Sequence, residues 1–488
     1  MAAAVLPLGA LMAGFAGGAV VVGMGTEVVV LSMLAAATVA GGVAVRHGGS
    51  WEDIQRATGQ RLASVLPAIL ILLAIGMLIG SWVLSGTIPL LISWGIQLVE
   101  PRFFILTAFL VTAVMSLATG TSWGSAGTLG VALMGAATAL EVPLGATAGA
   151  IVSGAYFGDK MSPLSDSTNI CAIGAGANLY AHIRHMLFTA LPSFGAAALV
   201  YGLAGGAAEA TISLPASAAE LLAEMRVVFE LEPWALLPVV VVVLGIAFRQ
   251  PPALALAASS VAALGVGVWG QGFRIRDAVQ AIVSGFEPHM VASLGHDPAA
   301  LSPAFLRLLE RGGLNSMAGT LIVILSAFLL AGGLDTSGAL DRIVRALLGA
   351  VSSAFGLISA TLAAGTMTIS MTSHGGVTAL IVGGLFRDAY RQRKLAPENL
   401  SRSLEDSVTI IEPLMPWTVS AIFMATTLDV ATVVYAPWAV FCYCGPLFSL
   451  LVALAYPWTG VGLKPVSAAK SQATTPQSKV RAEGSLGR

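Results

Sequence analysis

The chain has 488 residues, of which 56% are hydrophobic and only 10% charged, and its formal net charge at pH 7 is -1. An ordinary soluble domain is roughly a quarter charged, so this composition excludes a soluble enzyme, and the near-neutral balance argues against a nucleic-acid partner. Apolar stretches long enough to cross about 30 Å of hydrocarbon recur from end to end. We therefore expect an all-α polytopic membrane protein embedded in the lipid bilayer.

The apolar stretches in chain order lie near residues 3–22, 28–45, 63–83, 103–138, 144–170, 186–205, 234–248, 251–270, 315–334, 353–386, 400–428 and 432–457. Two shorter apolar segments, 88–99 and 338–350, are ambiguous, so the expected number of membrane segments is roughly 11–14. The predicted divisions are a first transmembrane repeat at 1–205, an acidic linker at 206–232, a second transmembrane repeat at 233–457 and a disordered cytoplasmic tail at 458–488.

A weak internal repeat relates the two halves. "GSWVLSGTIPLLI" at 80–92 is similar to "GGLDTSGALDRIV" at 332–344, and "TSWGSAGTLGVALMG" at 121–135 to "TSHGGVTALIVGG" at 372–384. "SPLSDST" around Pro163 is similar to "EPLMPWT" around Pro413. The three offsets are 252, 251 and 250 residues, and such a steady spacing predicts that one half is a copy of the other.

Charge placement predicts how the copies are oriented. The loop "FRDAYRQRKLAPENLSR" of the second half is basic, which makes it cytoplasmic, whereas its counterpart "ATALEVPLGATAG" has no basic residue. Seven spans per half invert the second copy and put both termini in the cytoplasm. Two parallel halves of six remain an alternative, although they place Arg184 and Arg249 outside. Inverted repeats with discontinuous helices are a plan of secondary transporters.

The stretch "GAYFGDKMSPLSDSTN" at 154–169 places charges inside an apolar run. If it is helical, Asp159, Ser162, Asp166 and Asn169 fall within about 80° of one another on one face. Pro163 tends to break the helix and to free carbonyl oxygens. Carboxylate, hydroxyl and carbonyl oxygens suit a small hard cation, and burial makes a carboxylate easier to protonate. The residues thus predict a site that holds either a proton or a cation.

A less specific interpretation is an interfacial loop, in which Lys160 forms a local ion pair with Asp159 or Asp166. Such a loop would avoid the cost of an ionised group at mid-membrane, about 2.5–3.5 kcal/mol.

The stretch "LSRSLEDSVTIIEPLMPWT" at 400–418 supplies further carboxylates, Glu405, Asp406 and Glu412, from the second half. Pro413 and Pro416 follow them and predict a second helix break. For Glu405 and Asp406 the alternative is a helix N-terminus near the cytoplasmic surface.

The stretch "LATGTSWGSAGTLG" at 117–130 is a flexible, hydroxyl-rich interruption, in which Thr121 and Ser122 are candidate ligands. A half-helix starting there would point its positive end inward. The alternative is close helix packing through small residues. In the partner stretch "SMTSHGGVTAL" at 370–380, His374 is either a proton-handling group or a hydrogen-bonded structural residue.

These segments resemble the NhaC family of bacterial Na+/H+ antiporters. "SLATGTSWGSAGTLGVALMG", "GAIVSGAYFGDKMSPLSDSTN", "HIRHMLFTALP" and "APENLSRSLEDS" are similar to its signature segments, and the resemblance runs from about Trp51 to the last span. The second half departs from the family pattern. Glu412 and Thr418 stand where relatives tend to have a small or polar residue and an asparagine, which leaves substrate identity and stoichiometry open.

The resemblance implies exchange of Na+, or Li+, for H+ across the bacterial inner membrane by alternating access. Asp159 and Asp166 would hold Na+ and H+ in competition, helped by the hydroxyl and amide ligands, with Glu405, Asp406 and Glu412 contributing and Lys160 and His374 as charge partners. The alternatives are a Na+- or H+-coupled exchanger of organic anions (malate/lactate type) or amino acids, and a channel. We expect no catalytic residue and no cofactor; a homodimer is left open.

Overall fold

The computed structural model describes residues 2–21, 26–206, 216–338, 342, 351 and 353–466, and these residues form helices and turns without a β-strand. Eight of the described helices are long and apolar enough to cross a membrane, or up to ten spans if two bent helix pairs are each counted as one. Thr87–Leu98 and Leu6–Gly18 are shorter apolar helices. The prediction of an all-α polytopic membrane protein is confirmed, whereas the larger count of 11–14 segments stays a prediction.

In the first half of the chain the helices are α1 (Ala2–Val21), α2 (Thr26–Arg46), α3 (Trp51–Leu84), α4 (Thr87–Leu98), α5 (Phe104–Thr119), α6 (Ser122–Ser125), α7 (Val131–Ala139), α8 (Leu144–Met161), α9 (Asp166–Ala175), α10 (Leu179–Gly206) and α11 (Ala216–Val228). In the second half they are α12 (Leu237–Ala247), α13 (Pro252–Gly265), α14 (Ile275–Val283), α15 (Pro303–Leu309), α16 (Ala318–Thr336), α18 (Ala354–Thr372), α19 (Gly375–Gln392), α20 (Pro397–Leu404), α21 (Val419–Leu428), α22 (Thr432–Tyr435) and α23 (Val440–Thr459).

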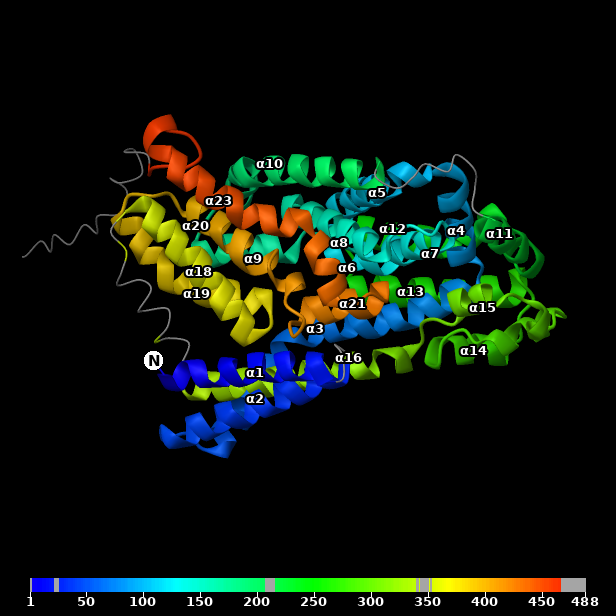
Figure 1. Cartoon of the computed structure of the whole chain (residues 1–488), viewed down its shortest axis with the longest axis horizontal. Coiled ribbons are helices and arrows are strands. Elements are labelled where there is room, and N and C mark those ends of the chain that lie inside the picture. Colours follow the sequence, from blue (N-terminus) through cyan, green and yellow to red (C-terminus); the bar gives the residue numbers. More distant parts are fainter. Residues whose placement is uncertain are drawn as a thin grey trace, which may run out of the picture.

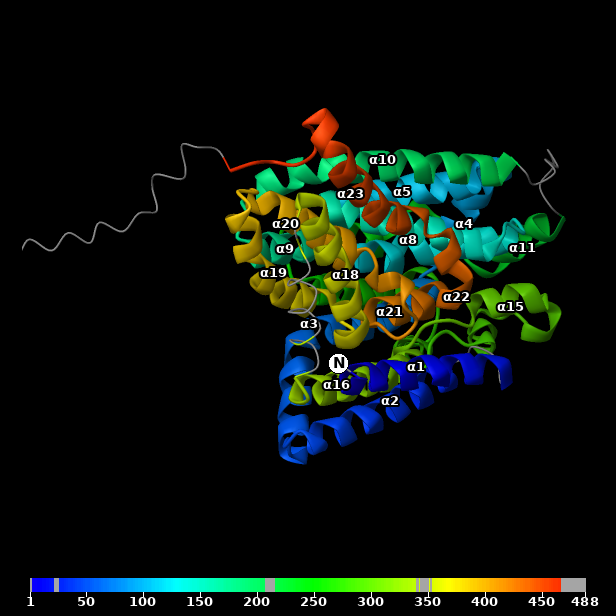
Figure 2. The same cartoon turned by 60° about the vertical axis from the view of Figure 1, so that its left-hand side comes forward.

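Helices α1, α2 and α16 form a layer along one edge of the molecule (Figures 1 and 2) and share a hydrophobic cluster that includes Leu11, Met33 and Leu330. The long α3 joins this layer to the rest of the protein. It begins with a capping box, in which the Ser50 hydroxyl accepts from the Asp53 N–H at 3.1 Å. Further along α3, the Arg61 guanidinium donates to both carboxylate oxygens of Asp335 at 2.5 and 2.6 Å, which ties α3 to α16.

Two helical hairpins enter the molecule. The first hairpin consists of α5 and the following α6–α7 segment. Helix α4, which precedes α5, also packs against α7, so the hairpin starts and ends near the same helix. In the second, α18 and α19 lie side by side (Figures 1 and 2). Their bends have the same backbone: a left-handed residue, Gly120 (φ 69°) or Ser373 (φ 60°), precedes an extended one, Thr121 (φ -145°) or His374 (φ -143°). The matched positions are 253 residues apart.

Two broken helices accompany the hairpins. The first breaks between α8 and α9, and the second between the turn at Glu412–Leu414 and α21, with a bend of 46°. Ser165 and Thr418 cap the helices that follow, and their hydroxyls accept from backbone N–H groups at 3.4 and 3.3 Å. These caps are again 253 residues apart. The inverted repeat stays a prediction, and the matched bends and caps are consistent with it.

Part of the expected linker is ordered. Within 206–232, α11 buries Leu221, Leu222 and Met225 and packs against α4, α7 and α15.

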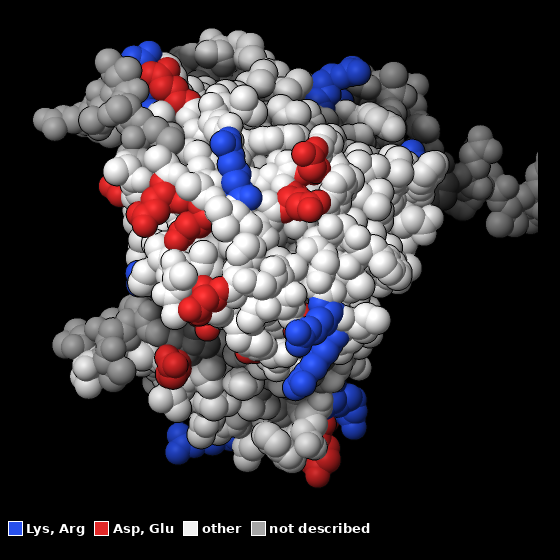
Figure 3. Space-filling model, turned by 90° about the vertical axis from the view of Figure 1, so that its right-hand side faces the viewer, with Lys and Arg blue, Asp and Glu red and all other residues white. Residues whose placement is uncertain are grey.

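Figure 3 looks at the end of the molecule that carries α11, α14 and α15, where acidic and basic side chains lie in separate groups on a largely uncharged surface. Residues 207–215 and most of the predicted tail, 467–488, lie outside the described residues.

Candidate ion-binding site

Two glycines place Asp159 beside the bend of the first hairpin. A Cβ at Gly154 would lie 2.3 Å from the Phe109 carbonyl oxygen, and one at Gly158 would lie 2.4 Å from the Leu117 nitrogen. Only glycine therefore allows α8 to approach α5 this closely. The approach brings Asp159 next to Ser122, whose hydroxyl donates to Asp159 Oδ2 at 2.8 Å.

The helix is interrupted around Pro163, where the sequence predicts a break. Helix α8 ends at Met161, Ser162 is extended (φ -87°, ψ 131°), and α9 begins at Asp166. The face that Asp159, Ser162, Asp166 and Asn169 would share in a continuous helix is therefore not formed, because the extended residues restart the helical phase. The freed carbonyls of Asp159 and Lys160 accept from the Thr168 hydroxyl at 3.2 and 3.1 Å.

Ser162 and Asn169 hold the break itself. The Ser162 hydroxyl accepts from the Leu164 N–H at 3.3 Å, and the Asn169 amide donates to the carbonyls of Pro163 and Ser165 at 3.2 and 2.7 Å. Neither residue lines the cavity beside Asp159. Their described contacts are those of residues that stabilise a turn.

A cavity of about 780 Å³ lies where the two hairpins and the two broken helices meet. Six of the predicted site residues line it: Thr121, Ser122, Asp159, Asp166, His374 and Glu412. Exposed Tyr180, Arg249 and Gln250 also line it. Carboxylates from both halves of the chain therefore face one water-accessible space.

The side chain of Glu412 lies beside the N-terminus of α19, the second helix of the second hairpin. The Gly375 N–H donates to Glu412 Oε2 at 3.1 Å, and Gly375 is the first residue of α19. A helix N-terminus carries a partial positive charge, which stabilises a nearby carboxylate by about 0.3–1 kcal/mol. Asp166 stands at the first position of α9 in the same way. His374 precedes α19, and its Nδ1 is buried without a hydrogen-bond partner among the described residues.

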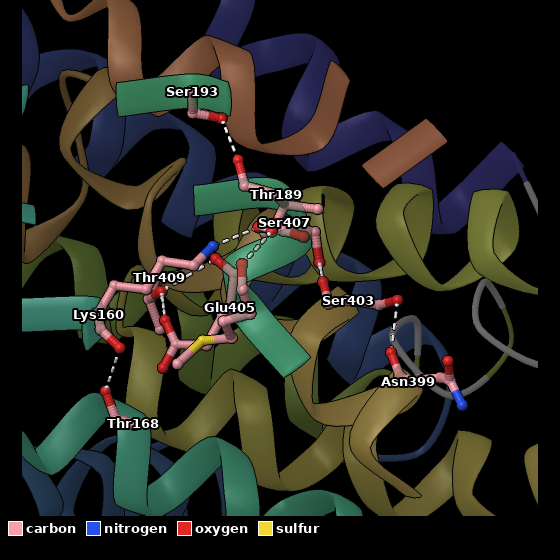
Figure 4. A network of polar contacts seen from close by, with 11 residues as sticks. Lys160, Thr168, Thr189, Ser193, Asn399, Ser403, Glu405, Ser407 and Thr409 are labelled. Carbon is pink, nitrogen blue, oxygen red and sulfur yellow. Dashed lines mark hydrogen bonds and ion pairs between the residues drawn. The ribbon is translucent and has the colours of Figure 1, made fainter. Parts of the chain in front are cut away.

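Lys160 forms a buried ion pair with Asp406, and their side chains are only 1% and 0% exposed. The interpretation of a local pair with Asp159 or Asp166 is wrong, because Lys160 pairs with a residue 246 positions away. The Thr189 hydroxyl also donates to Asp406, at 3.3 Å. Figure 4 shows this network, in which the Thr409 hydroxyl donates to Glu405.

Glu405 and Asp406 are fully buried in a π-helical turn at Glu405–Thr409, so the alternative of a helix N-terminus at the surface is wrong for them. They do not line the cavity. One carboxylate oxygen of each, Glu405 Oε1 and Asp406 Oδ2, has no hydrogen-bond partner in the described part of the chain.

Sequence reasoning missed several residues that shape the site. The Thr168 hydroxyl donates to the backbone carbonyls of Asp159 and Lys160 at the first break, and the Gly375 N–H donates to Glu412. Tyr156 and Ser420 line the cavity. The repeated bend motif was the available signal for Gly375, whereas Thr168 and Ser420 look like ordinary helix hydroxyls in the sequence. Within the described ranges, no group of three or more His, Cys, Asp or Glu side chains is placed to hold a resident metal.

Comparison with known proteins identifies the family. The model of the Na+/H+ antiporter family matches residues 154–456. The chain belongs to the Na+/H+ antiporter family. A protein of Haemophilus influenzae named as an uncharacterized Na+/H+ antiporter is 41% identical over 88% of this chain and 90% of its own length.

Two further relatives carry names with stated ions or substrates. The Na+/H+ antiporter NhaC of Alkalihalophilus pseudofirmus is 34% identical over 84% of this chain and 86% of its own length. The malate-2H+/Na+-lactate antiporter of Bacillus subtilis is 31% identical over 85% and 86%. The expected resemblance to NhaC is confirmed, and the named relatives are transporters. The chain is a multi-pass membrane protein of this antiporter family.

Proposed function

We propose that this protein exchanges Na+, or Li+, for H+ across the bacterial inner membrane by alternating access. Family membership and the NhaC relatives support Na+/H+ antiport as its activity. The observation that carries the proposed site is the convergence of Asp159, Asp166 and Glu412 on one cavity. Ser122 and Gly375, at the bends of the two hairpins, donate to two of these carboxylates.

The donor set suits a small hard cation. Carboxylates with the hydroxyls of Thr121 and Ser122 offer hard oxygen ligands, which Na+ and Li+ favour over soft ones. The same carboxylates accept protons when no cation is bound, so a single site serves both ions in turn. His374, on the cavity wall, is an additional proton-handling group in this proposal.

The buried network of Lys160, Asp406 and Glu405 has a different role in this proposal. It lies outside the cavity, and it joins α8 to the π-helical turn of the second half. We therefore assign the transported ions to the cavity carboxylates and assign the network to holding the two broken helices together. Ser162 and Asn169 hold the first break.

The orientation follows from the basic loop at 387–402, which would be cytoplasmic, with both termini on the same side. Rocking of the two halves about the site would expose the carboxylates to each side in turn. The matched bends and caps at a spacing of 253 residues support such a two-fold arrangement.

Everted vesicles test the proposal directly. A pH gradient is established, and its dissipation on adding Na+, Li+ or K+ is followed with a fluorescent dye. Asp159→Asn and Glu412→Gln should each abolish or strongly reduce Na+-driven dissipation, whereas Glu220→Gln, an exposed acid of α11, serves as the matched control. Wild-type protein that gives no response between pH 7 and 9 would refute the proposal, as would full activity in both cavity variants.

A second candidate is exchange of an organic acid or amino acid coupled to these ions. The cavity, at about 780 Å³, has the volume of a small-molecule site rather than that of a bare ion, and Arg249 on its lining offers a partner for a substrate carboxylate. Counterflow of labelled malate, lactate and amino acids separates the two candidates. Na+-driven dissipation without any counterflow supports simple cation exchange.

A further inference from the structure

A second cavity lies toward the end of the molecule that carries α14 and α15. Its volume is about 340 Å³, and its walls come from the segments after α14 and α15, from the start of α7 and from the end of α21. Three acids line it, Glu287, Glu310 and Asp429, together with Arg311. Helices α14 and α15, whose following segments line the cavity, lie at the end of the molecule that Figure 3 faces.

Three separate elements run from the first cavity to the second. Along α3, Ile71 lines the first and Ile79 the second; along α6–α7 the residues are Trp123 and Val131. Along α21, Ser420 lines the first and Thr426 the second. At 1.5 Å per residue, six to eight residues correspond to about 9–12 Å. The two cavities therefore approach each other from opposite ends, with a thin barrier between them.

Aromatic rings form the centre of this barrier. The rings of Trp123 and Phe423 stack with their centroids 4.1 Å apart and an angle of 7° between their planes. Phe423 is fully buried on α21, between the residues that line the two cavities. A second π-helical turn, at Ala126–Gly130, follows α6, and a Cβ at Gly127 would lie 2.6 Å from Ile75 Cδ1, so this turn packs tightly against α3.

One wall of the second cavity is fixed to α3, and the opposite wall is not. The Gly313 N–H donates to the Gly76 carbonyl at 2.7 Å, and a Cβ at Gly312 would lie 2.2 Å from the Gly80 nitrogen. In contrast, the end of α21 meets this wall through the Arg311–Asp429 pair, with N···O 3.7 Å apart and Asp429 77% exposed. A movement of α21 relative to α3 that separates the rings would break this weak pair and the 2.8 Å hydrogen bond between the Thr426 and Thr320 hydroxyls.

A threonine in the wall of the second cavity has a buried hydroxyl without a hydrogen-bond partner among the described residues. Thr427 lines the cavity and is 3% exposed, and its hydroxyl has no hydrogen-bond partner among the described residues. An unpaired buried hydroxyl costs about 1–3 kcal/mol, unless water or an ion occupies the space beside it. The acids on the rim attract cations.

We propose that the second cavity is the external entry and exit site for the transported cation, with Thr427 as an oxygen ligand, and that the Trp123–Phe423 stack closes the path between the two cavities. This inference rests on the proposed function, because it assumes that a monovalent cation such as Na+ crosses the barrier. The acids of the second cavity concentrate the cation, and Arg311 holds Asp429 while the stack is closed.

Cysteine labelling from each side of the membrane tests the path. In a background with Cys171, Cys442 and Cys444 replaced by serine, Thr427→Cys and Ser64→Cys are treated with a membrane-impermeant charged thiol reagent. Ser64 lines the first cavity and is the matched control for the other side. Thr427→Cys should react in right-side-out vesicles only, and Ser64→Cys in everted vesicles only.

Removal of the ring stack tests the barrier. Phe423→Ala should make Thr427→Cys reactive from both sides and should raise the Na+-independent proton leak at least severalfold. Phe328→Ala, an equally buried residue of α16 that lines neither cavity, should do neither. Phe423→Leu keeps much of the volume without the stack and replaces Phe423→Ala if that variant does not reach the membrane.

The two proposals fail in different ways. Thr427→Cys that reacts only from the cytoplasmic side, or from neither side, in a variant that still exchanges Na+ for H+ would overturn the external site. Unchanged leak and unchanged labelling in the Phe423 variants would overturn the barrier. Absence of Na+/H+ exchange with the expected labelling pattern would count against the proposed function alone.

Discussion

Removal of either partner from the Lys160–Asp406 pair should cost more stability than removal of both. The two side chains are 1% and 0% exposed, so each variant leaves the other charge buried without its counter-ion. Such a loss costs about 3–5 kcal/mol, whereas replacing both partners by apolar groups of similar volume is often close to neutral. Lys160→Met should be the more costly single change, because Glu405 lies beside Lys160 in Figure 4 and takes over as its partner when Asp406 is replaced.

The assay is a double-mutant cycle on the purified protein in detergent. Lys160→Met, Asp406→Leu and the double variant are unfolded with denaturant, and the free energies of unfolding are compared. The coupling energy should be at least about 2 kcal/mol. The exposed pair Arg56–Asp53, at 68% and 44% exposure, is the matched control, and its coupling should lie between about 0 and 1 kcal/mol. Additive single effects at the buried pair would refute the argument.

Three smaller changes probe the site and its packing. Ser122→Ala removes the 2.8 Å bond to Asp159, so the Na+ concentration for half-maximal exchange should change about tenfold while folding is retained; an unchanged value contradicts this. Gly158→Ala puts a Cβ 2.4 Å from the backbone of α5 and should cost about 1–3 kcal/mol, seen as a lower melting temperature than that of the wild type. Gly375→Ala puts a Cβ 2.5 Å from Glu412 Oε2 and should weaken Na+ activation; wild-type kinetics would contradict the placement of Glu412.

The positions of the helix breaks could be predicted from the sequence, because the causes are local. Pro163 cannot continue a helix, and Gly120 accepts the left-handed backbone that ends α5. The composition likewise predicts a membrane protein, since repeated apolar runs of about 20 residues match the thickness of the hydrocarbon core of a bilayer. The carboxylates at Asp159 and Glu412 were identifiable as functional candidates because an acid in an apolar run is costly.

Side-chain directions near the breaks could not be predicted, because they depend on helical phase. The extended Ser162 restarts the phase between Asp159 and Asp166, and the π-helical turn at Glu405–Thr409 adds a residue to one turn. Glu405 and Asp406 therefore point away from the cavity. The partner of Lys160 is 246 residues distant, and such a contact depends on the packing of both halves, which no local pattern contains.

If Na+ and H+ share the cavity carboxylates, acid pH should act on the apparent affinity for Na+ and not on the maximal rate. Each proton that must leave before Na+ binds raises the half-maximal Na+ concentration about tenfold per pH unit below the pKa of that carboxylate. A proton carried on a separate group, such as Lys160, would instead lower the maximal rate at acid pH. Initial rates of Na+-driven dissipation, measured over a matrix of Na+ concentrations and pH values, distinguish the two.

The variants sharpen this competition test. Asp166 is exposed in the cavity, and Asp159 is partly buried against Ser122, so Asp166→Asn should retain a competitive pH dependence that Asp159→Asn loses. A pH effect confined to the maximal rate in the wild type would show that the two ions do not share a site. In that case the proton would be carried by the buried network of Lys160, Asp406 and Glu405 or by His374 on the cavity wall, and Lys160→Met should abolish the pH dependence of the rate only if the network is the carrier.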